Sequence, residues 1–178
     1  MSVFTKVSSY DGSGVKIAEM VYYDQKPLLG RELVLDDEGR IHAVIPWSHG
    51  KKNGVEKVYN KEGNLEMEIR WKNGKQGGVQ TIYDDVGLKI ESSEWRDGKK
   101  HGVELFYRRN QTVWKSIEWR WGKKHGNATE YYYSGEVKSI QLWNRNRKKG
   151  FKKFYDLDGS KINWFVQMWR MLVKTFTF

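Results

Sequence analysis

Residues 77–100 read GGVQTIYDDVGLKIESSEWRDGKK, and this stretch decides the fold. Its first extended segment, 79–83, is rich in β-branched and aromatic residues, which favour strands. A turn at 84–87 ends in glycine, and a second extended segment follows at 88–96. Asp-Gly at 97–98 is the dipeptide typical of a tight β-hairpin. The stretch therefore predicts a strand, a turn, a second strand and a hairpin turn.

The same unit returns every 24 residues along the chain. The glycine that opens the first strand keeps this step, as Gly30, Gly54, Gly78, Gly102, Gly126 and Gly150. So does the tryptophan before the hairpin, as Trp47, Trp71, Trp95, Trp119 and Trp143. A tyrosine column has the same period, as Tyr59, Tyr83, Tyr107, Tyr131 and Tyr155. A fixed period of this length indicates a repeat array, and arrays present long surfaces more often than they enclose catalytic pockets.

Apolar and polar residues alternate within the predicted strands. Leu65, Met67, Ile69 and Trp71 are separated by charged residues, so that one face of the strand is apolar. Neighbouring strands lie about 4.8 Å apart, so each unit advances the sheet by about 10 Å. We expect an all-β fold, an elongated single-layer antiparallel meander of about six β-hairpin repeats of 24 residues.

The two ends of the chain depart from the repeat. Residues 1–29 carry Tyr23 in place of tryptophan, and we expect a capping half-repeat there. Residues 30–162 form the β-repeat array. Residues 163–178 have polar residues at helical spacing, which favours a short amphipathic helix, but β-branched and aromatic residues also allow edge strands. Either structure would cap the last strands.

Aromatic residues make up 15% of the chain. A single layer has no second sheet to cover its apolar face, and large rings can cover one another. We therefore interpret the tryptophan and tyrosine columns as packing. The alternative is a row of exposed rings that binds a partner. Trp95, Tyr107 and Trp119 are its candidates, because central positions of an interface contribute most.

The chain has 32 Lys and Arg against 22 Asp and Glu, a formal net charge of +10, which favours an acidic partner. Lysines recur in the hairpin turns, and the candidates in the middle of the array are Lys99, Lys100, Lys123 and Lys124. We expect these turns to line one edge of the sheet as a track for an acidic surface. The alternative is that they only keep this edge soluble. Nucleic acid is disfavoured, since single-strand binders interleave basic residues with aromatic rings on one face.

The sequence lacks the residue patterns of an enzyme. It has no cysteine, which excludes disulfides and thiolate metal sites, and no phosphate loop or catalytic serine motif. The histidines read as exposed turn residues; His101 and His125 are one unit apart, about 10 Å, too far to share a metal ion. We expect no catalytic residues, cofactor or metal. The start resembles no signal peptide, and we expect a cytoplasmic protein.

At residues 71–83, WKNGKQGGVQTIY, and 96–107, RDGKKHGVELFY, the sequence resembles the MORN repeat. The variant is that of bacterial YwqK-type antitoxin-like proteins. The matching features are the tryptophan, the Asn-Gly-Lys or Asp-Gly-Lys turn, the Gly-Gly or His-Gly after it, and the aromatic residue five positions on. The resemblance covers residues 30–160 and implies the β-repeat fold. The family also includes scaffolds, membrane tethers and enzymes with accessory repeats.

Two residues depart from this pattern. Gln111 replaces a turn glycine, and we expect it to alter that turn; Asn127 replaces a valine, and we expect it to weaken or open the sheet. For function, we expect a non-catalytic protein-binding module, an antitoxin or immunity-like neutraliser that occludes an acidic protein such as a toxin. The alternative is a membrane-associated scaffold that binds anionic lipid through the basic turns and residues 163–178. The sequence leaves the oligomeric state open.

Overall fold

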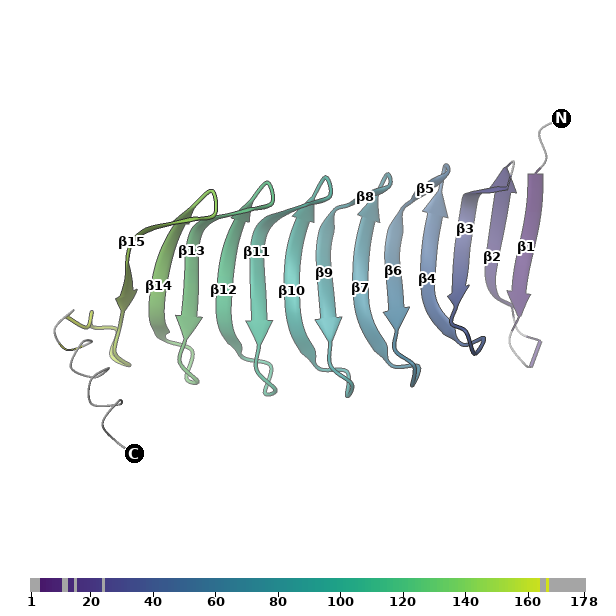
Figure 1. The fold of residues 1–178 in the computed structure, drawn as a ribbon. Coiled ribbons are helices and arrows are strands. Elements are labelled where there is room, and N and C mark those ends of the chain that lie inside the picture. Colours follow the sequence, from purple (N-terminus) through teal and green to yellow (C-terminus); the bar gives the residue numbers. More distant parts are fainter. Residues whose placement is uncertain (1–3, 11–12, 15, 24, 164–165, 167–178) are drawn as a thin grey trace.

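The computed structural model describes residues 4–10, 13–14, 16–23, 25–163 and 166. Within these residues, 15 strands form one open antiparallel sheet in chain order, with β5 and β8 as short strands beside β4 and β7. The predicted all-β meander is confirmed, and Figure 1 shows β1 and β15 at opposite ends of a single layer. The strands are β1 (Phe4–Tyr10), β2 (Lys16–Tyr23), β3 (Lys26–Leu35), β4 (Ile41–Ser48), β5 (Lys51–Lys52), β6 (Gly54–Tyr59), β7 (Leu65–Lys72), β8 (Lys75–Gln76), β9 (Gly78–Tyr83), β10 (Lys89–Arg96), β11 (Lys99–Tyr107), β12 (Val113–Arg120), β13 (Lys123–Tyr131), β14 (Val137–Asn144) and β15 (Arg147–Phe154).

The ends of the array are described in part. β1 and β2 continue the sheet before the repeats, and the expected boundary at residue 30 lies inside β3. The prediction of a helix or strands over residues 163–178 falls outside the described residues, apart from Asn163 and Val166. In the described part of the chain, no helix is long and apolar enough to cross a membrane.

The upper hairpins, at the top of Figure 1, join the tryptophan-bearing strand to the strand after it. Both central residues of these turns have positive φ, for example 51° at Asp97 and 75° at Gly98, as type I′ turns require. Successive hairpins are also bonded to each other: Gly98 N–H donates to Gln76 O and Gly122 N–H to Lys100 O, each at 2.8 Å. The upper edge is therefore a continuous hydrogen-bonded structure. Its turns are centred on residues 49–50, 73–74, 97–98, 121–122 and 145–146.

The lower turns join the other strand ends, and Gln111 does not alter the one that contains it. It adopts a φ of 64°, close to the 82° of Gly87 in the preceding turn. Its N–H donates to Arg108 O at 2.8 Å, as Gly87 N–H donates to Asp84 O at 3.0 Å. The prediction of a changed turn is wrong, because the left-handed conformation is open to glutamine at a modest cost.

Asn127 does not open the sheet either. It lies opposite Leu142, and Gly126 lies opposite Trp143. The strands one unit earlier pair in the same register, with Val103 opposite Glu118. The side chain of Asn127 is exposed, so its amide needs no buried partner. The prediction of an opened sheet is wrong, and that of a weakened sheet stays a prediction.

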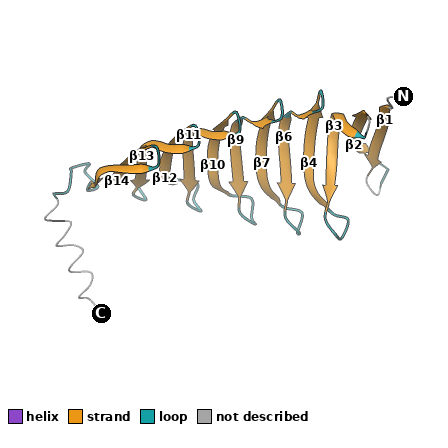
Figure 2. Ribbon diagram, turned by 45° about the horizontal axis from the view of Figure 1, so that its top comes forward, coloured by secondary structure: helices purple, strands orange, loops and turns teal. Residues whose placement is uncertain are grey.

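The sheet has two unlike faces. The tryptophan face carries the tryptophan column and a cross-strand row in which Ser93 lies opposite Glu104, Glu104 opposite Ile117, and Ile117 opposite Ala128. Figure 2 shows the strands as one curved, twisted layer, and within the described residues no second sheet covers either face. The buried residues of the tryptophan face are mostly apolar towards the N-terminus and mostly polar towards the C-terminus. In chain order, the buried residues of this face are Ala18, Met20, Ala43, Ile45, Glu56, Ser93, Glu104, Ile117, Ser139 and Gln141.

The opposite face, the tyrosine face, is held by hydrogen bonds between neighbouring strands. The Tyr83 hydroxyl donates to Glu68 Oε2 at 3.0 Å, and the Tyr107 hydroxyl lies 2.9 Å from Ser92 Oγ. The Tyr131 hydroxyl lies 3.2 Å from Ser116 Oγ. This column therefore has the packing role preferred in the sequence analysis.

Candidate functional site

A ladder of lysines and tryptophans runs along the upper part of the tryptophan face. The second lysine of an upper hairpin lies directly opposite the tryptophan of its unit, as Lys100 does opposite Trp95. Opposite residues of paired strands share a face, so this lysine is turned onto the rings. We call the set the tryptophan–lysine ladder: Trp47, Trp71, Trp95, Trp119 and Trp143 with Lys52, Lys100, Lys124 and Lys148.

Each of the two central ladder lysines contacts two rings. Lys100 Nζ lies 5.8 Å from the centre of the Trp95 ring and 5.3 Å from that of Trp119. Lys124 Nζ lies 5.7 Å from Trp119 and 5.0 Å from Trp143. Such cation–π contacts contribute about 0.5–2 kcal/mol each, depending on desolvation. The lysines thus link one repeat to the next.

Buried carboxylates complete the ladder. Lys52 Nζ lies 2.9 Å from Glu56 Oε2. Two repeat units later, Lys100 Nζ contacts Glu104 Oε1 in the same way. Glu104 is 4% exposed, and its other oxygen accepts the indole N–H of Trp119 at 3.0 Å. Burying a carboxylate is unfavourable unless it is paired and hydrogen-bonded, and both conditions hold here.

Glu91 is a second carboxylate near the same lysine. Its Oε1 lies 3.6 Å from Lys100 Nζ. Burial raises the pKa of Glu91; the attraction of Lys100 opposes this rise, and repulsion by Glu104 adds to it. The net effect is a raised pKa of Glu91. Glu91 and Glu104 therefore share the single ammonium group of Lys100 on the tryptophan face.

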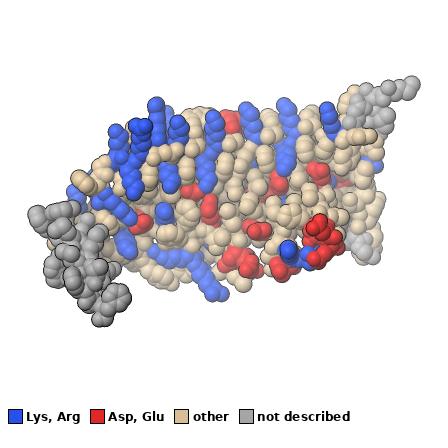
Figure 3. All heavy atoms as spheres, viewed as in Figure 1, with Lys and Arg blue, Asp and Glu red and all other residues tan. Residues whose placement is uncertain are grey.

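The first lysine of each hairpin points away from the ladder. Lys51, Lys75, Lys99 and Lys123 are all exposed, and we call these four residues the basic edge. Figure 3 shows Lys and Arg side chains gathered along the upper edge of the molecule. The prediction that both lysines of a turn line this edge is corrected: Lys100 and Lys124 lie on the tryptophan face, because neighbouring strand residues point to opposite faces.

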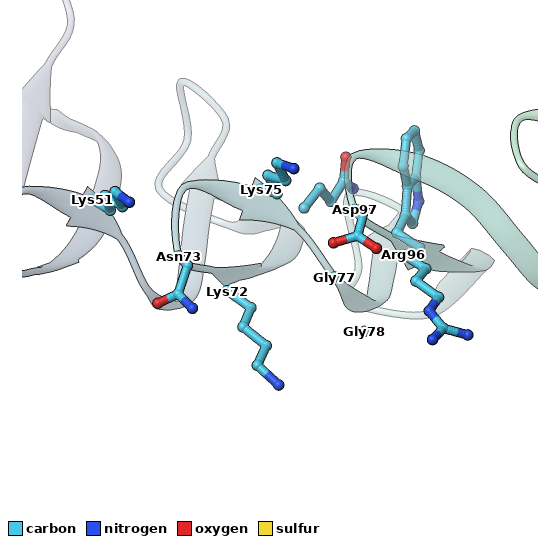
Figure 4. Close-up of a pocket in the computed structure, with 10 residues that line it drawn as sticks. Lys51, Lys72, Asn73, Lys75, Gly77, Gly78, Arg96 and Asp97 are labelled. Carbon is cyan, nitrogen blue, oxygen red and sulfur yellow. The ribbon is translucent and has the colours of Figure 1, made fainter.

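A groove of about 750 Å³ lies at this edge between successive hairpins. Figure 4 shows Lys51, Lys75 and Arg96 around it, each from a different unit of the array. Its lining residues are Lys51, Lys72, Asn73, Lys75, Gln76, Gly77, Gly78, Trp95, Arg96 and Asp97.

The groove lies where the repeat departs from its pattern at two neighbouring positions. Gln76 stands in the place of a ladder lysine, and Gly77 stands where the next unit has His101. The His101 ring is half-buried and packs against the Trp121 ring, 4.7 Å between centres. One unit earlier, Gly77 and Asp97 stand in the places of His101 and Trp121, so this pair of rings is absent there. The expectation that His101 is an exposed turn residue is therefore wrong.

The seven predicted partner-binding residues do not form one site. Trp95 and Trp119 lie in the ladder, and their rings are half-buried. Tyr107 lies on the opposite face, bonded to Ser92. Of the lysines, two belong to the basic edge and two to the ladder: Lys99 and Lys123 to the former, Lys100 and Lys124 to the latter.

The premise used against nucleic acid is also corrected. Basic residues and aromatic rings do alternate on one face, with Lys100 between Trp95 and Trp119. These rings, however, are half-buried and stacked against ammonium groups of the same chain. Base stacking needs a free ring face, so the ladder does not supply the platform that single-strand binders use.

Sequence reasoning missed Trp121. It is 47% exposed and has a φ of 52° at the first central position of its hairpin, where Asn73 and Asp97 stand in the preceding units. Besides packing on His101, its ring lies 5.6 Å from the Arg96 guanidinium. A tryptophan at a position that favours Asn or Asp was the available signal, but Trp121 lies outside the 24-residue tryptophan column.

Comparison of the chain with protein-family models finds no match, and no curated protein matches it. Within the described ranges, no group of three or more His, Asp or Glu side chains is placed to hold a metal ion. The arrangement of charges and rings is therefore the basis on which a function is proposed.

Proposed function

We propose that this protein is a non-catalytic binding module whose basic edge and adjoining groove bind an acidic protein. The observation that carries the proposal is the direction of the first lysine in each hairpin. Among the described residues, none of the ammonium groups of Lys51, Lys75, Lys99 and Lys123 forms an ion pair, whereas Lys52 and Lys100 do. The repeat thus uses one lysine for packing and presents the other to solvent.

The geometry of the edge suits an extended acidic surface. Consecutive units place these ammonium groups about 10 Å apart, on turns that are hydrogen-bonded to one another. The lysine stems also lie against the next turn: a Cβ on Gly74 would be in ordinary contact with Lys51 Cβ, at 3.6 Å. A preorganised row of like charges raises the rate of association with an opposite charge and loses strength as salt increases.

The resemblance to the MORN-repeat variant supports a more specific proposal, that the protein is an antitoxin or immunity-like neutraliser in the cytoplasm. Its mechanism would be occlusion. The long edge would cover the active surface of an acidic toxin while the groove beside Gly77 receives a protruding side chain. No bond-making step is needed, so catalytic residues have no part in it.

Reversing the charge of the basic edge is expected to abolish partner capture. The variant K51E/K75E/K99E/K123E is compared with K61E/K89E/R109E/K153E, which changes the net charge equally at exposed positions elsewhere. Tagged chains are expressed in the native cell, and captured proteins are quantified by mass spectrometry. We expect the wild type and the control to retain one stoichiometric acidic protein, and the edge variant to lose it by about tenfold or more.

The membrane-scaffold alternative rests on the same row of lysines, since an anionic bilayer is also an acidic surface. Co-sedimentation with phosphatidylserine vesicles separates the two proposals. Wild-type chain that binds these vesicles, is released by salt and captures no protein would replace the neutraliser proposal with the scaffold.

A further inference from the structure

A small, strongly basic pocket lies on the tryptophan face near its C-terminal end. Its volume is about 170 Å³, and it is formed by strands β12 to β15. We call it the lysine pocket. Four of its lining residues are lysines and one is a carboxylate: Lys115, Lys124, Lys148 and Lys152, with Glu130. The remaining lining residues are Ile117, Ala128, Gln141 and Trp143.

The preceding unit shows what this position normally holds. Residues 32, 56 and 104 are glutamates at 24-residue steps or multiples of them. Glu104 bridges two donors, the Lys100 ammonium at one oxygen and the Trp119 indole N–H at the other. Glu32 likewise accepts the indole N–H of Trp47, at 2.8 Å. Among the described residues, Glu56 binds only Lys52, so the carboxylates of this column contact a lysine, a tryptophan or, at Glu104, both.

Ala128 occupies the same place in the lysine pocket. It lies opposite Ile117 on one side and Gln141 on the other, as Glu104 lies opposite Ser93 and Ile117. The two donors remain. Lys124 Nζ lies 5.0 Å from the centre of the Trp143 ring and, among the described residues, forms no ion pair.

The indole nitrogen of Trp143 gives an independent indication. Trp143 Nε1 is buried and has no acceptor in the described part of the chain. Trp71 Nε1 is in the same state, but the unit of Trp71 has its own carboxylate, Glu56. Only around Ala128 do an unpaired ammonium group and an unpaired buried N–H converge, among the units that the structure describes.

Glu130 does not satisfy these donors. Its Oε2 accepts Lys152 Nζ and Ser139 Oγ, each at 2.8 Å. Burial raises the pKa of Glu130, but these two hydrogen bonds and the attraction of Lys152 and Lys115 outweigh it and hold the pKa below its usual value. Glu130 is therefore ionised and engaged, and four lysines with one carboxylate leave three positive charges at the pocket.

We propose that the lysine pocket binds a carboxylate group, held as Glu104 is held one unit earlier, with one oxygen on Lys124 and the other on the Trp143 indole N–H. A carboxylate fits because the two donors are those that already bridge a carboxylate in this chain. Resting on the proposed function, we assign the group to an aspartate or glutamate side chain of the acidic partner. Binding would satisfy the buried donors that Ala128 leaves unpaired.

The test uses the full chain and the indole N–H signals of its ¹H–¹⁵N spectrum, in which W143F assigns the Trp143 signal. Acetate is titrated at constant ionic strength against chloride, with phosphate as a separate arm. The variant A128E should place its own carboxylate in the pocket, and N127E adds the same charge at the neighbouring exposed position. We expect a saturable downfield shift of Trp143 with acetate in the wild type and N127E, and none in A128E.

Several results would overturn the proposal. Equal shifts with chloride, equal shifts in A128E, or tighter binding of phosphate than of acetate would each contradict a carboxylate site. Partner capture then tests the source of the group: A128E should lose the acidic partner, and undiminished capture would overturn that assignment. If no variant captures a protein but acetate still saturates the Trp143 signal, the proposed function fails and the carboxylate site stands.

Discussion

Replacing Glu104 with alanine is expected to lower the free energy of unfolding by about 3 kcal/mol, because it leaves a partly buried ammonium group without its main partner. Glu104 is 4% exposed and binds both Lys100 and the Trp119 indole. Glu91 Oε1, 3.6 Å from Lys100 Nζ, still attracts this ammonium group in the variant, which limits the loss of stability. Urea denaturation followed by tryptophan fluorescence measures the change.

The matched control is Glu118→Ala, which removes an exposed carboxylate from the strand next to Glu104. Substitutions at such positions change stability by about 0.5 kcal/mol or less. If Glu104→Ala costs no more than the control, the ladder does not hold neighbouring repeats together.

Replacing Gly30 with alanine is expected to cost about 3–4 kcal/mol, from an unfavourable backbone conformation and a steric clash together. Gly30 has a φ of 122°, and a Cβ there would lie 2.0 Å from the backbone oxygen of Glu19. Backbone atoms of a paired strand cannot move aside as the end of a side chain can. The pairing of β2 with β3 should therefore loosen, which hydrogen exchange of these two strands would show.

Gly39→Ala separates the two contributions. Gly39 also has a positive φ, 78°, but a Cβ there would meet nothing within 4 Å. We expect a cost of about 1–2 kcal/mol, that of the conformation alone. Equal losses in the two variants would contradict the steric part of the explanation.

The fold could be predicted from the sequence because the period fixes both turns and strands. Expected segments 79–83 and 88–96 agree with β9 and β10 to within one residue at each end. The errors at Gln111 and Asn127 have a common cause. An array with regular neighbours on both sides imposes its backbone on an atypical residue, which adopts the local φ or points its polar group to solvent.

The candidate sites could be predicted only in part. Alternation along a strand predicts that the side chains of Lys99 and Lys100 point in opposite directions. The prediction of a basic edge treated both lysines as one group and so missed this difference. Predicting the lysine pocket also requires the strand register. Ala128 is visible as a departure in the glutamate column, but its significance depends on Lys124 and Trp143, which the strand register brings to it.

In the proposed function, the pairs Lys51–Lys52 and Lys99–Lys100 divide their roles: the first lysine binds the partner and the second packs within the sheet. The most direct measurement compares K51M/K99M with K52M/K100M, which make the same change at adjacent positions, for thermal midpoint and partner capture. We expect K51M/K99M to keep the midpoint and lose the partner, and K52M/K100M to lower the midpoint by about 5 °C or more. Equal midpoints for the two variants, or partner capture undiminished in K51M/K99M, would contradict the account.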